Sequence, residues 1–169
     1  MKEKITVKKS GIDNRGIFAS EKIKKGETIC FLKGEEKNIP QMRKEVLSGK
    51  ERINDPLQIG KRKYIDIEEP YLYFNHSCNP NAGIKGKNEL FAIKDIKKGE
   101  EITFDYSTTS WEENWNIPND EEFSMVCKCG SKNCRKIVRE FYHLDKKTKL
   151  KYLKLGALPD FIISKFKNN

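Results

Sequence analysis

The chain contains 169 residues, of which 36% are hydrophobic, 10% aromatic and 35% charged. This length and apolar content suffice for one compact domain with a small appendage, and the charged residues predict a heavily ionised surface. No apolar run approaches the roughly 20 residues that span a bilayer, so we expect no membrane partner. The first five residues lack the apolar stretch of a secretory signal, which predicts an intracellular protein, cytoplasmic or nuclear.

The net charge of +9 is distributed unevenly. Residues 1–126 carry 22 Lys or Arg and 22 Asp or Glu and are therefore neutral. Residues 127–169 carry 12 Lys or Arg and 3 Asp or Glu, which accounts for the whole positive net charge. Residues 112–122 contain five acidic side chains and no Lys or Arg. Solvated surfaces explain both segments; alternatively, the basic tail meets nucleic acid or an acidic partner, and the acidic stretch attracts a basic peptide.

Short strands and one short helix are predicted in the first half of the chain. β-Branched and aromatic residues in partial alternation favour strands at Lys4–Lys8, Ile29–Lys33 and Arg62–Ile67. Pro40–Leu47 is a candidate for a short helix.

A sequence unit is repeated at an offset of 73 residues. Residues 18–29 and 91–102 are identical at eight of twelve positions. Each copy combines a strand pattern, a Lys-Lys-Gly-Glu turn and a second strand pattern, and Gly supplies the positive φ that such turns often need. Two copies are too few for a solenoid, so the repeat predicts one β-rich domain that uses the unit twice.

Two helices are predicted near the C-terminus. Asp145 is a suitable N-cap, leucines up to Leu155 form a partial apolar face, and Gly156 is a suitable stop. Pro159 opens a shorter helix that ends near Phe166. The predicted division of the chain is a core at 1–108, an acidic linker loop at 109–126, a cysteine segment at 127–138 and a basic helical tail at 139–169.

The five cysteines indicate a metal site. An odd number of cysteines in an intracellular chain argues against a disulfide framework, and three of them form a C-x-C-x4-C pattern within residues 127–134. Close thiols suit structural Zn²⁺, which takes four ligands in a closed tetrahedron. The three ligands of the pattern are Cys127, Cys129 and Cys134. The candidates for the fourth are Cys78, Cys30, His76 and His143.

Three motifs together resemble one protein family. Residues 75–81, Asn-His-Ser-Cys-Asn-Pro-Asn, resemble the N-H-S-C-x-P-N signature of SET-domain protein lysine methyltransferases. Residues 99–106 resemble the later signature of that family, and the C-x-C-x4-C pattern resembles its post-SET motif. The order and spacing match over residues 5–138. The resemblance implies a mainly β SET fold of small sheets with a pseudoknot and a zinc-binding post-SET segment at 127–138, here followed by a short helical tail.

The resemblance also implies S-adenosylmethionine as the methyl donor. Asn75 and His76 would contact its adenosine part, largely through backbone groups. The cofactor loop is represented by Asn14-Arg15-Gly16, in which Asn14 replaces a Gly and tolerates left-handed backbone. The structural zinc would take its fourth ligand from the first signature. The implied zinc ligands are Cys78, Cys127, Cys129 and Cys134.

Four aromatic residues complete the implied site. Tyr106 is the expected catalytic residue and cofactor contact, because the matching hydroxyl lies beside the transferring methyl group and the amine. Phe104 matches the position that tunes the product state, and Phe there favours di- and trimethylation. Tyr64 and Tyr73 are candidates for the walls of the lysine channel, with cation–π attraction for the methylated product.

The resemblance implies a protein lysine N-methyltransferase that acts on a basic, lysine-containing protein, and histones are the usual target of the family. Two alternatives compete with this interpretation. The fold could serve as a peptide-binding module with weak or no catalysis, or the basic zinc-containing C-terminal segment could dock on nucleic acid.

Overall fold

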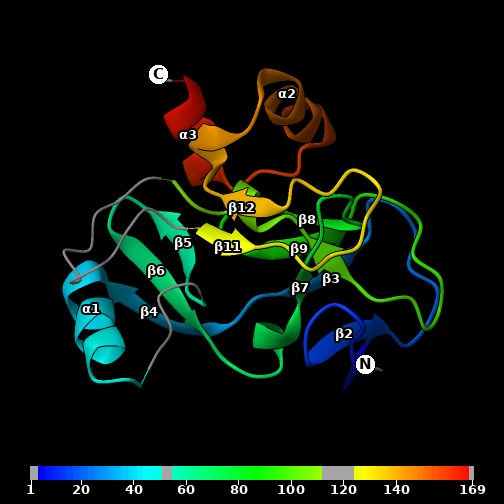
Figure 1. The fold of residues 1–169 in the computed structure, drawn as a ribbon, viewed down its shortest axis with the longest axis horizontal. Helices are drawn as coiled ribbons and strands as arrows, with labels where there is room; N and C mark the ends of the chain where they lie inside the picture. The colour runs from blue at the N-terminus through cyan, green and yellow to red at the C-terminus, as the bar shows by residue number, and fades with distance from the viewer. Residues whose placement is uncertain (1–3, 51–54, 112–123, 168–169) are drawn as a thin grey trace.

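The computed structural model describes residues 4–50, 55–111 and 124–167. Within these ranges the chain forms several two- and three-stranded β-sheets, with one helix at an edge and two helices over one side (Figure 1). The predicted mainly β fold with short C-terminal helices is therefore confirmed. In the part of the chain that the structure describes, no helix is long and apolar enough to cross a membrane.

The first two sheets consist of short antiparallel strands. β1 (Ile5–Lys9) pairs with β2 (Arg15–Ala19). β9 (Glu89–Ala92) lies between β3 (Thr28–Phe31) and β8 (Ala82–Lys85). The two strands predicted in this region are present, each displaced by one residue at its start.

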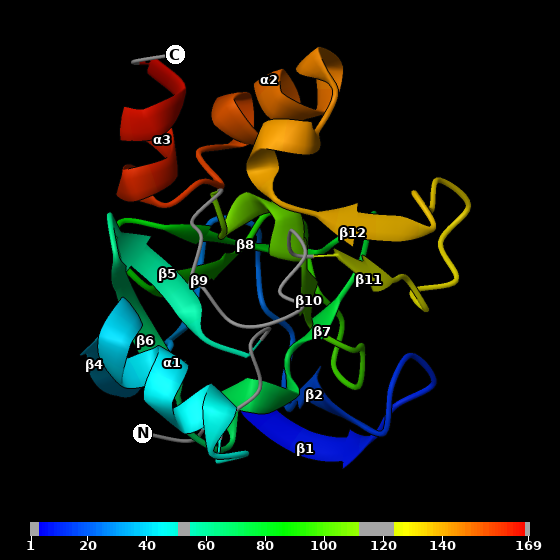
Figure 2. The same ribbon diagram turned by 60° about the vertical axis from the view of Figure 1, so that its left-hand side comes forward.

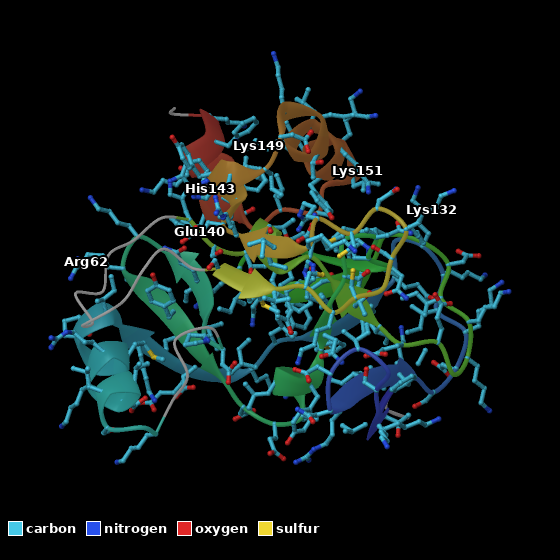
Figure 3. The ribbon with its side chains drawn as sticks, viewed as in Figure 1. Arg62, Lys132, Glu140, His143, Lys149 and Lys151 are labelled. Atoms are coloured by element: carbon cyan, nitrogen blue, oxygen red, sulfur yellow. The ribbon has the colours of Figure 1, made fainter. Side chains whose placement is uncertain are left out.

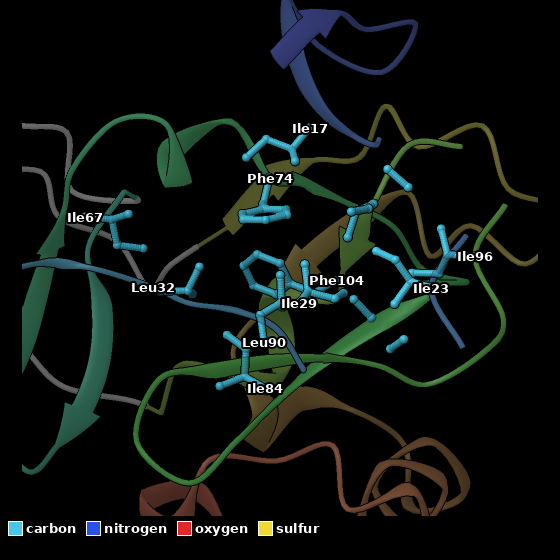
Figure 4. Packing of buried hydrophobic residues seen from close by; sticks show 14 of the residues in the cluster. Ile17, Ile23, Ile29, Leu32, Ile67, Phe74, Ile84, Leu90, Ile96 and Phe104 are labelled. Carbon is cyan, nitrogen blue, oxygen red and sulfur yellow. The ribbon is translucent and has the colours of Figure 1, made fainter. Parts of the chain in front are cut away.

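The two copies of the repeated unit pair with each other. The backbone amides of Ile23 and Ile96 each donate to the carbonyl of the other residue, at 2.9 and 2.8 Å, and Figure 4 shows the two side chains close together. Since these residues occupy equivalent positions in the repeat, an approximate two-fold axis passes between them. Gly26 and Gly99 adopt matching left-handed φ values of 88° and 81°, as the predicted turns require.

A second three-stranded sheet carries the edge helix. β6 (Lys63–Ile67) lies between β4 (Gly34–Asn38) and β5 (Leu57–Gly60). The helix α1 (Ile39–Leu47) follows β4 directly and lies beside this sheet (Figure 2). It begins with a capping box, in which the Asn38 side chain accepts from the backbone N–H of Gln41 and the Gln41 side chain accepts in return. The predicted helix and strand are both present.

The main hydrophobic core lies between these sheets. Phe74 and Phe104 face each other near its centre, with Leu32, Leu90 and Ile17 around them (Figure 4). Ile17, Leu32 and Leu90 are completely buried. Both copies of the repeat contribute to this core, the first through Ile23 and Ile29 and the second through Ile96 and Ile102.

The predicted helices of the tail are confirmed. α2 (Lys146–Leu155) is capped by Asp145, whose carboxylate accepts from the backbone N–H of Thr148, and it ends at Gly156 in the left-handed conformation. α3 (Asp160–Lys167) follows Pro159. Both helices lie above β8 and the short strand β12 (Ile137–Arg139) in Figure 1 and again in Figure 2.

The tail is packed firmly against the central sheet. Phe141, Leu158 and Ile162 form one buried cluster with Phe91 and Ile93, which belong to the second repeat. The close approach requires a glycine in β8, because a Cβ atom on Gly83 would lie 2.6 Å from the Cβ of Ala157.

Candidate active site

Two short parallel strands form the centre of the site. β7 (Asn75–His76) comes from the first signature and pairs with β10 (Thr103–Phe104) from the second. The amide of Ser77 extends the pairing by donating to the Phe104 carbonyl at 3.0 Å. Asn81 stabilises this pair of strands from the side, since its side chain accepts from the Thr103 amide at 2.9 Å. The motifs that are far apart in sequence are therefore adjacent in space, as the implied pseudoknot requires.

Tyr106 follows β10 and begins the short 3₁₀ turn η2 (Tyr106–Thr108). Its hydroxyl donates to the backbone carbonyl of Phe74 at 2.6 Å. Its ring centroid lies 5.0 Å from that of Phe104 and 5.4 Å from that of His76. Burial, reinforced by negative charges that include Glu101, raises the pKa of Tyr106 above its usual range. The phenol therefore stays protonated, and it can orient groups without acting as a strong base.

The loop between β1 and β2 lies against β7. The Asn75 amide group donates to the carbonyl of Arg15 at 2.9 Å and to Oε1 of Glu101 at 2.7 Å. Asn14 has a φ of 34°, a left-handed value that Asn tolerates better than most residues. Gly16 packs directly on the Glu101 carboxylate. The predicted cofactor loop Asn14-Arg15-Gly16 is thus held beside the paired strands β7 and β10. Sequence reasoning missed Glu101 as the support of this loop.

His76 is buried and acts as a link between Tyr106 and a cysteine. Its Nδ1 accepts from the Tyr106 backbone N–H at 3.2 Å, so the ring proton lies on Nε2, which is 3.3 Å from Sγ of Cys78. Burial lowers the pKa of His76 to about 4; the charge of Arg135 acts in the same direction, and Asp105 opposes it. A neutral imidazole with both nitrogens hydrogen-bonded within the protein fits a structural role beside the paired strands β7 and β10.

The cysteines gather beside His76. The ligand atoms of His76, Cys78, Cys127 and Cys129 all lie within 4.8 Å of one another, and the Sγ atoms of Cys78 and Cys127 are 3.8 Å apart. Cys134 lies outside this set of four. The strands β11 (Ser124–Val126) and β12 (Ile137–Arg139) pair on either side of the cysteine segment and close it into a loop.

Backbone amides surround the sulfur atoms. Cys127, Cys78 and Cys134 each accept from a backbone N–H, at 3.5, 3.3 and 3.3 Å. Such donors favour thiolates, the form in which cysteine binds metal. A set of soft sulfur ligands with an imidazole beside it fits structural zinc. Cys30 instead packs against the main core from β3, and burial raises the pKa of its thiol to about 12, with Lys33 opposing the shift.

An ion pair connects the cysteine segment to Asp105, the residue that follows β10. Arg135 donates to both carboxylate oxygens of Asp105, at 2.8 and 2.6 Å, and the Asp105 side chain is fully buried. The spacing of the motifs does not show this pair, because the two residues are 30 positions apart. One clue is present in the sequence, which is that Arg135 directly follows the last cysteine.

The predicted channel residues separate into two groups. Phe104 lies beside Tyr106 in the main core, and Tyr73 packs against the same core with the Arg15 guanidinium 4.4 Å from its ring centre. Tyr64 belongs to a separate cluster with Met42 under α1. The five acidic residues of 112–122 lie outside the described residues.

Comparison with known proteins identifies the family. The SET domain model matches residues 14–107, more than half of the chain, and the protein belongs to the SET-domain family. The chain is 34% identical over 160 residues to a variant-silencing SET domain-containing protein of Plasmodium falciparum, covering 85% of this chain and 6% of that protein. It is 29% identical to an H3 lysine-9-specific histone-lysine N-methyltransferase of Fusarium mangiferae, covering 73% of this chain and 45% of that one.

Solved structures show the same fold. One is ctPRC2 in an autoinhibited conformation bound to S-adenosylmethionine, with 26% identity and a TM-score of 0.55 over 63% of this chain and 15% of that one. A humanized mutant of the Chaetomium thermophilum Polycomb Repressive Complex 2, bound to an inhibitor, gives 26% identity and a TM-score of 0.54 over 62% and 15%. This chain spans less than half the length of each of these relatives.

Proposed function

We propose that this protein is an S-adenosylmethionine-dependent protein lysine N-methyltransferase. The observation that carries the proposal is the position of Tyr106. Its hydroxyl is held beside the paired strands β7 and β10 by its hydrogen bond to the Phe74 carbonyl. In methyl transfer the lysine nitrogen attacks the methyl carbon while the carbon–sulfur bond breaks and its electrons pass to sulfur. S-adenosylmethionine supplies the activated methyl group for this displacement.

The geometry of Tyr106 suits this reaction. The single hydroxyl proton is used in the bond to Phe74, so the oxygen lone pairs remain to accept from the amine N–H or from polarised C–H groups of the methyl. An unperturbed lysine has a pKa near ~10.4, and apolar surroundings such as Phe104 favour the neutral amine that the reaction needs. Alignment of the amine with the methyl group supplies the remaining advantage.

The side chains of Asn75 and His76 support a cofactor site by shaping it. Both are bonded within the protein, to the Arg15 carbonyl and to the Tyr106 amide respectively. Their arrangement fits the expectation that adenosine is contacted largely through backbone groups, with Asn14-Arg15-Gly16 forming the adjacent loop.

We propose structural zinc on Cys78, Cys127, Cys129 and Cys134. The N–H donated to Cys134 matches those donated to Cys78 and Cys127, which favours Cys134 as the fourth ligand. His76 then donates its Nε2 proton to the Cys78 sulfur from outside the ligand set.

The relatives support a proposal for the substrate class. Several are histone-lysine methyltransferases, including enzymes specific for H3 lysine 4 and H3 lysine 9. We therefore propose a basic, lysine-containing substrate such as a histone tail, and a nuclear or chromatin-associated location. The assay is incubation of the protein with labelled S-adenosylmethionine, a panel of histones and a cell lysate.

The matched control for this assay is Tyr106→Phe, which keeps the ring and removes the hydroxyl. Label in a protein band is the expected result, with a loss of about a hundredfold or more in the variant. Equal labelling by the variant contradicts the role of Tyr106. Binding of S-adenosylmethionine by calorimetry, without label transfer to any protein, would instead favour the peptide-binding module.

A nucleic-acid contact is a second candidate function, favoured by the surface of α2. This helix of ten residues carries five lysines and no acidic side chain. Lys149 and Lys151 lie on it, and Lys132 lies on the cysteine segment (Figure 3). Lys94 of the second repeat adds to this positive surface: burial lowers its pKa, and the charge of the neighbouring Lys151 acts in the same direction. Phosphate groups are the natural counterpart of such a surface.

Substitution of exposed α2 lysines tests this contact. Changing Lys147, Lys151 and Lys154 to Gln should weaken binding to duplex DNA and lower the salt-dependence slope by about 0.9 for each phosphate that these lysines neutralise. The control changes Lys22, Lys24 and Lys25 to Gln, an equal charge change on the exposed surface of the first repeat. An equal effect of both variants would show a non-specific charge effect and oppose the proposal.

A further inference from the structure

We propose that Tyr152, in the C-terminal helix α2, is a positioning residue for the active site, which holds the Asp105 carboxylate between Tyr106 and the cysteine cluster. The residue lies outside the matched SET region of residues 14–107, so the tail supplies a part of the site. The catalytic consequence rests on the methyltransferase activity proposed above, whereas the effect on the metal site does not.

The contact itself is buried and direct. The Tyr152 hydroxyl donates to Oδ2 of Asp105 at 2.7 Å, and the tyrosine is 1% exposed. The same carboxylate accepts two bonds from Arg135 and one from the backbone N–H of Ser107 at 3.1 Å. A buried carboxylate needs such a complete set of donors, because each missing one leaves charge without compensation. Tyr152 is the donor that comes from the tail.

One end of this network reaches Tyr106. Asp105 precedes Tyr106 directly, and its side chain caps the 3₁₀ turn η2 that begins with Tyr106. The position of the carboxylate therefore helps to set the backbone of the turn. The hydroxyl of Tyr106 must remain in line with the Phe74 carbonyl for the proposed role, so a displaced turn would misplace it.

The other end reaches the cysteines. The Arg135 side chain is fixed on Asp105, while the Arg135 backbone N–H donates to Sγ of Cys78 at 3.3 Å. The guanidinium also donates to the Ser107 hydroxyl at 3.0 Å. Asp105 thus couples the catalytic turn to the proposed zinc site through a single arginine.

The tail holds Tyr152 in a fixed place. The ring belongs to the buried cluster that includes Phe141, Leu158 and Ile162. Burial, followed by the adjacent Asp105 charge, raises the pKa of Tyr152, so its hydroxyl keeps the proton that it donates. The C-terminal helices therefore have a role in the site in addition to covering the sheet.

The test compares Tyr152→Phe with Tyr142→Phe. The first removes one buried hydroxyl and keeps the ring; the second removes a hydroxyl from a ring in the same tail that is 56% exposed. We expect Tyr152→Phe to lower kcat by about tenfold while KM for a peptide substrate changes by less than about twofold. We also expect it to speed the release of zinc to a chromogenic chelator. Tyr142→Phe should match the unchanged protein in both measurements.

Two results would overturn the proposal: unchanged kcat and zinc release in Tyr152→Phe, or a loss of activity that matches the unfolded fraction seen by circular dichroism. If the unchanged protein transfers no methyl group, the proposed function fails, but zinc release still tests the network. A double-mutant cycle with Asp105→Asn and Tyr152→Phe gives a further measurement, and additive effects on zinc release would count against a coupling of these residues.

Discussion

Gly16 and Glu101 are in direct contact, and a Cβ atom on Gly16 would lie 2.2 Å from Oε1 of the carboxylate. Glu101 cannot simply turn away, because it accepts from the Ser10 hydroxyl at 2.8 Å and from the Asn75 amide group at 2.7 Å. The glycine of the predicted cofactor loop is therefore required by space, whereas Asn14 in the same loop is suited to its left-handed backbone.

A Gly16→Ala substitution should consequently weaken the cofactor loop. Overpacking of this kind costs about 1–3 kcal/mol, and we expect the affinity for S-adenosylmethionine to fall by about tenfold. Isothermal titration calorimetry measures it. The control is Gly11→Ala in the connection between β1 and β2, where an added Cβ meets no atom within 4 Å. Equal affinities of the two variants would show that the Gly16 contact does not shape the binding site.

The product state should depend on Phe104. This residue is buried and its ring lies 5.0 Å from that of Tyr106. Under the proposed function, a Phe104→Tyr substitution would place a hydroxyl, and with it an ordered water, in the space that repeated methylation requires. We expect products to shift from di- and trimethyl-lysine toward monomethyl-lysine, measured by mass spectrometry of a modified peptide. An unchanged ratio of products would remove Phe104 from this role.

Zinc removal should affect activity before it affects the β-core. The cysteine cluster is joined to the paired strands β7 and β10 through Cys78 and His76, whereas the main core consists of apolar side chains, most of them from other strands. We expect one zinc per chain by plasma mass spectrometry, and loss of transfer activity at chelator concentrations that leave the circular dichroism of the strands intact. Cys134→Ser should lower the zinc content. Full zinc in this variant would assign the fourth ligand to His76.

Cys30 should react differently from the other thiols. Burial raises the pKa of the Cys30 thiol to about 12, so its thiolate fraction is low at neutral pH. The thiolate fraction of an ordinary cysteine levels off above its pKa of ~8.5, whereas that of Cys30 should continue to rise about tenfold per pH unit. Alkylation rates followed by mass spectrometry between pH 7 and 10 test this. After chelation, the cluster cysteines should react first. A rate for Cys30 that levels off near pH 9 would contradict its protected position.

Much of the secondary structure could be predicted because its signals are local. The capping of α2 by Asp145 and Gly156 depends on residues within a few positions of each helix end. The Lys-Lys-Gly-Glu turns depend on Gly26 and Gly99. That the two copies pair with each other was not predictable from either copy, since pairing depends on which strands the rest of the core brings together.

By itself, the sequence determined the class of fold, the motifs of the site and the cysteines available to a metal, because these depend on residue type and short spacing. The tertiary structure decided how they are connected. It brought Arg135 and Tyr152 to the Asp105 carboxylate across 30 and 47 residues, and it separated Tyr64 from Tyr106. The physical reason is that a buried charge must be compensated by whichever donors the packed chain places next to it, and local periodicity carries no information about distant partners.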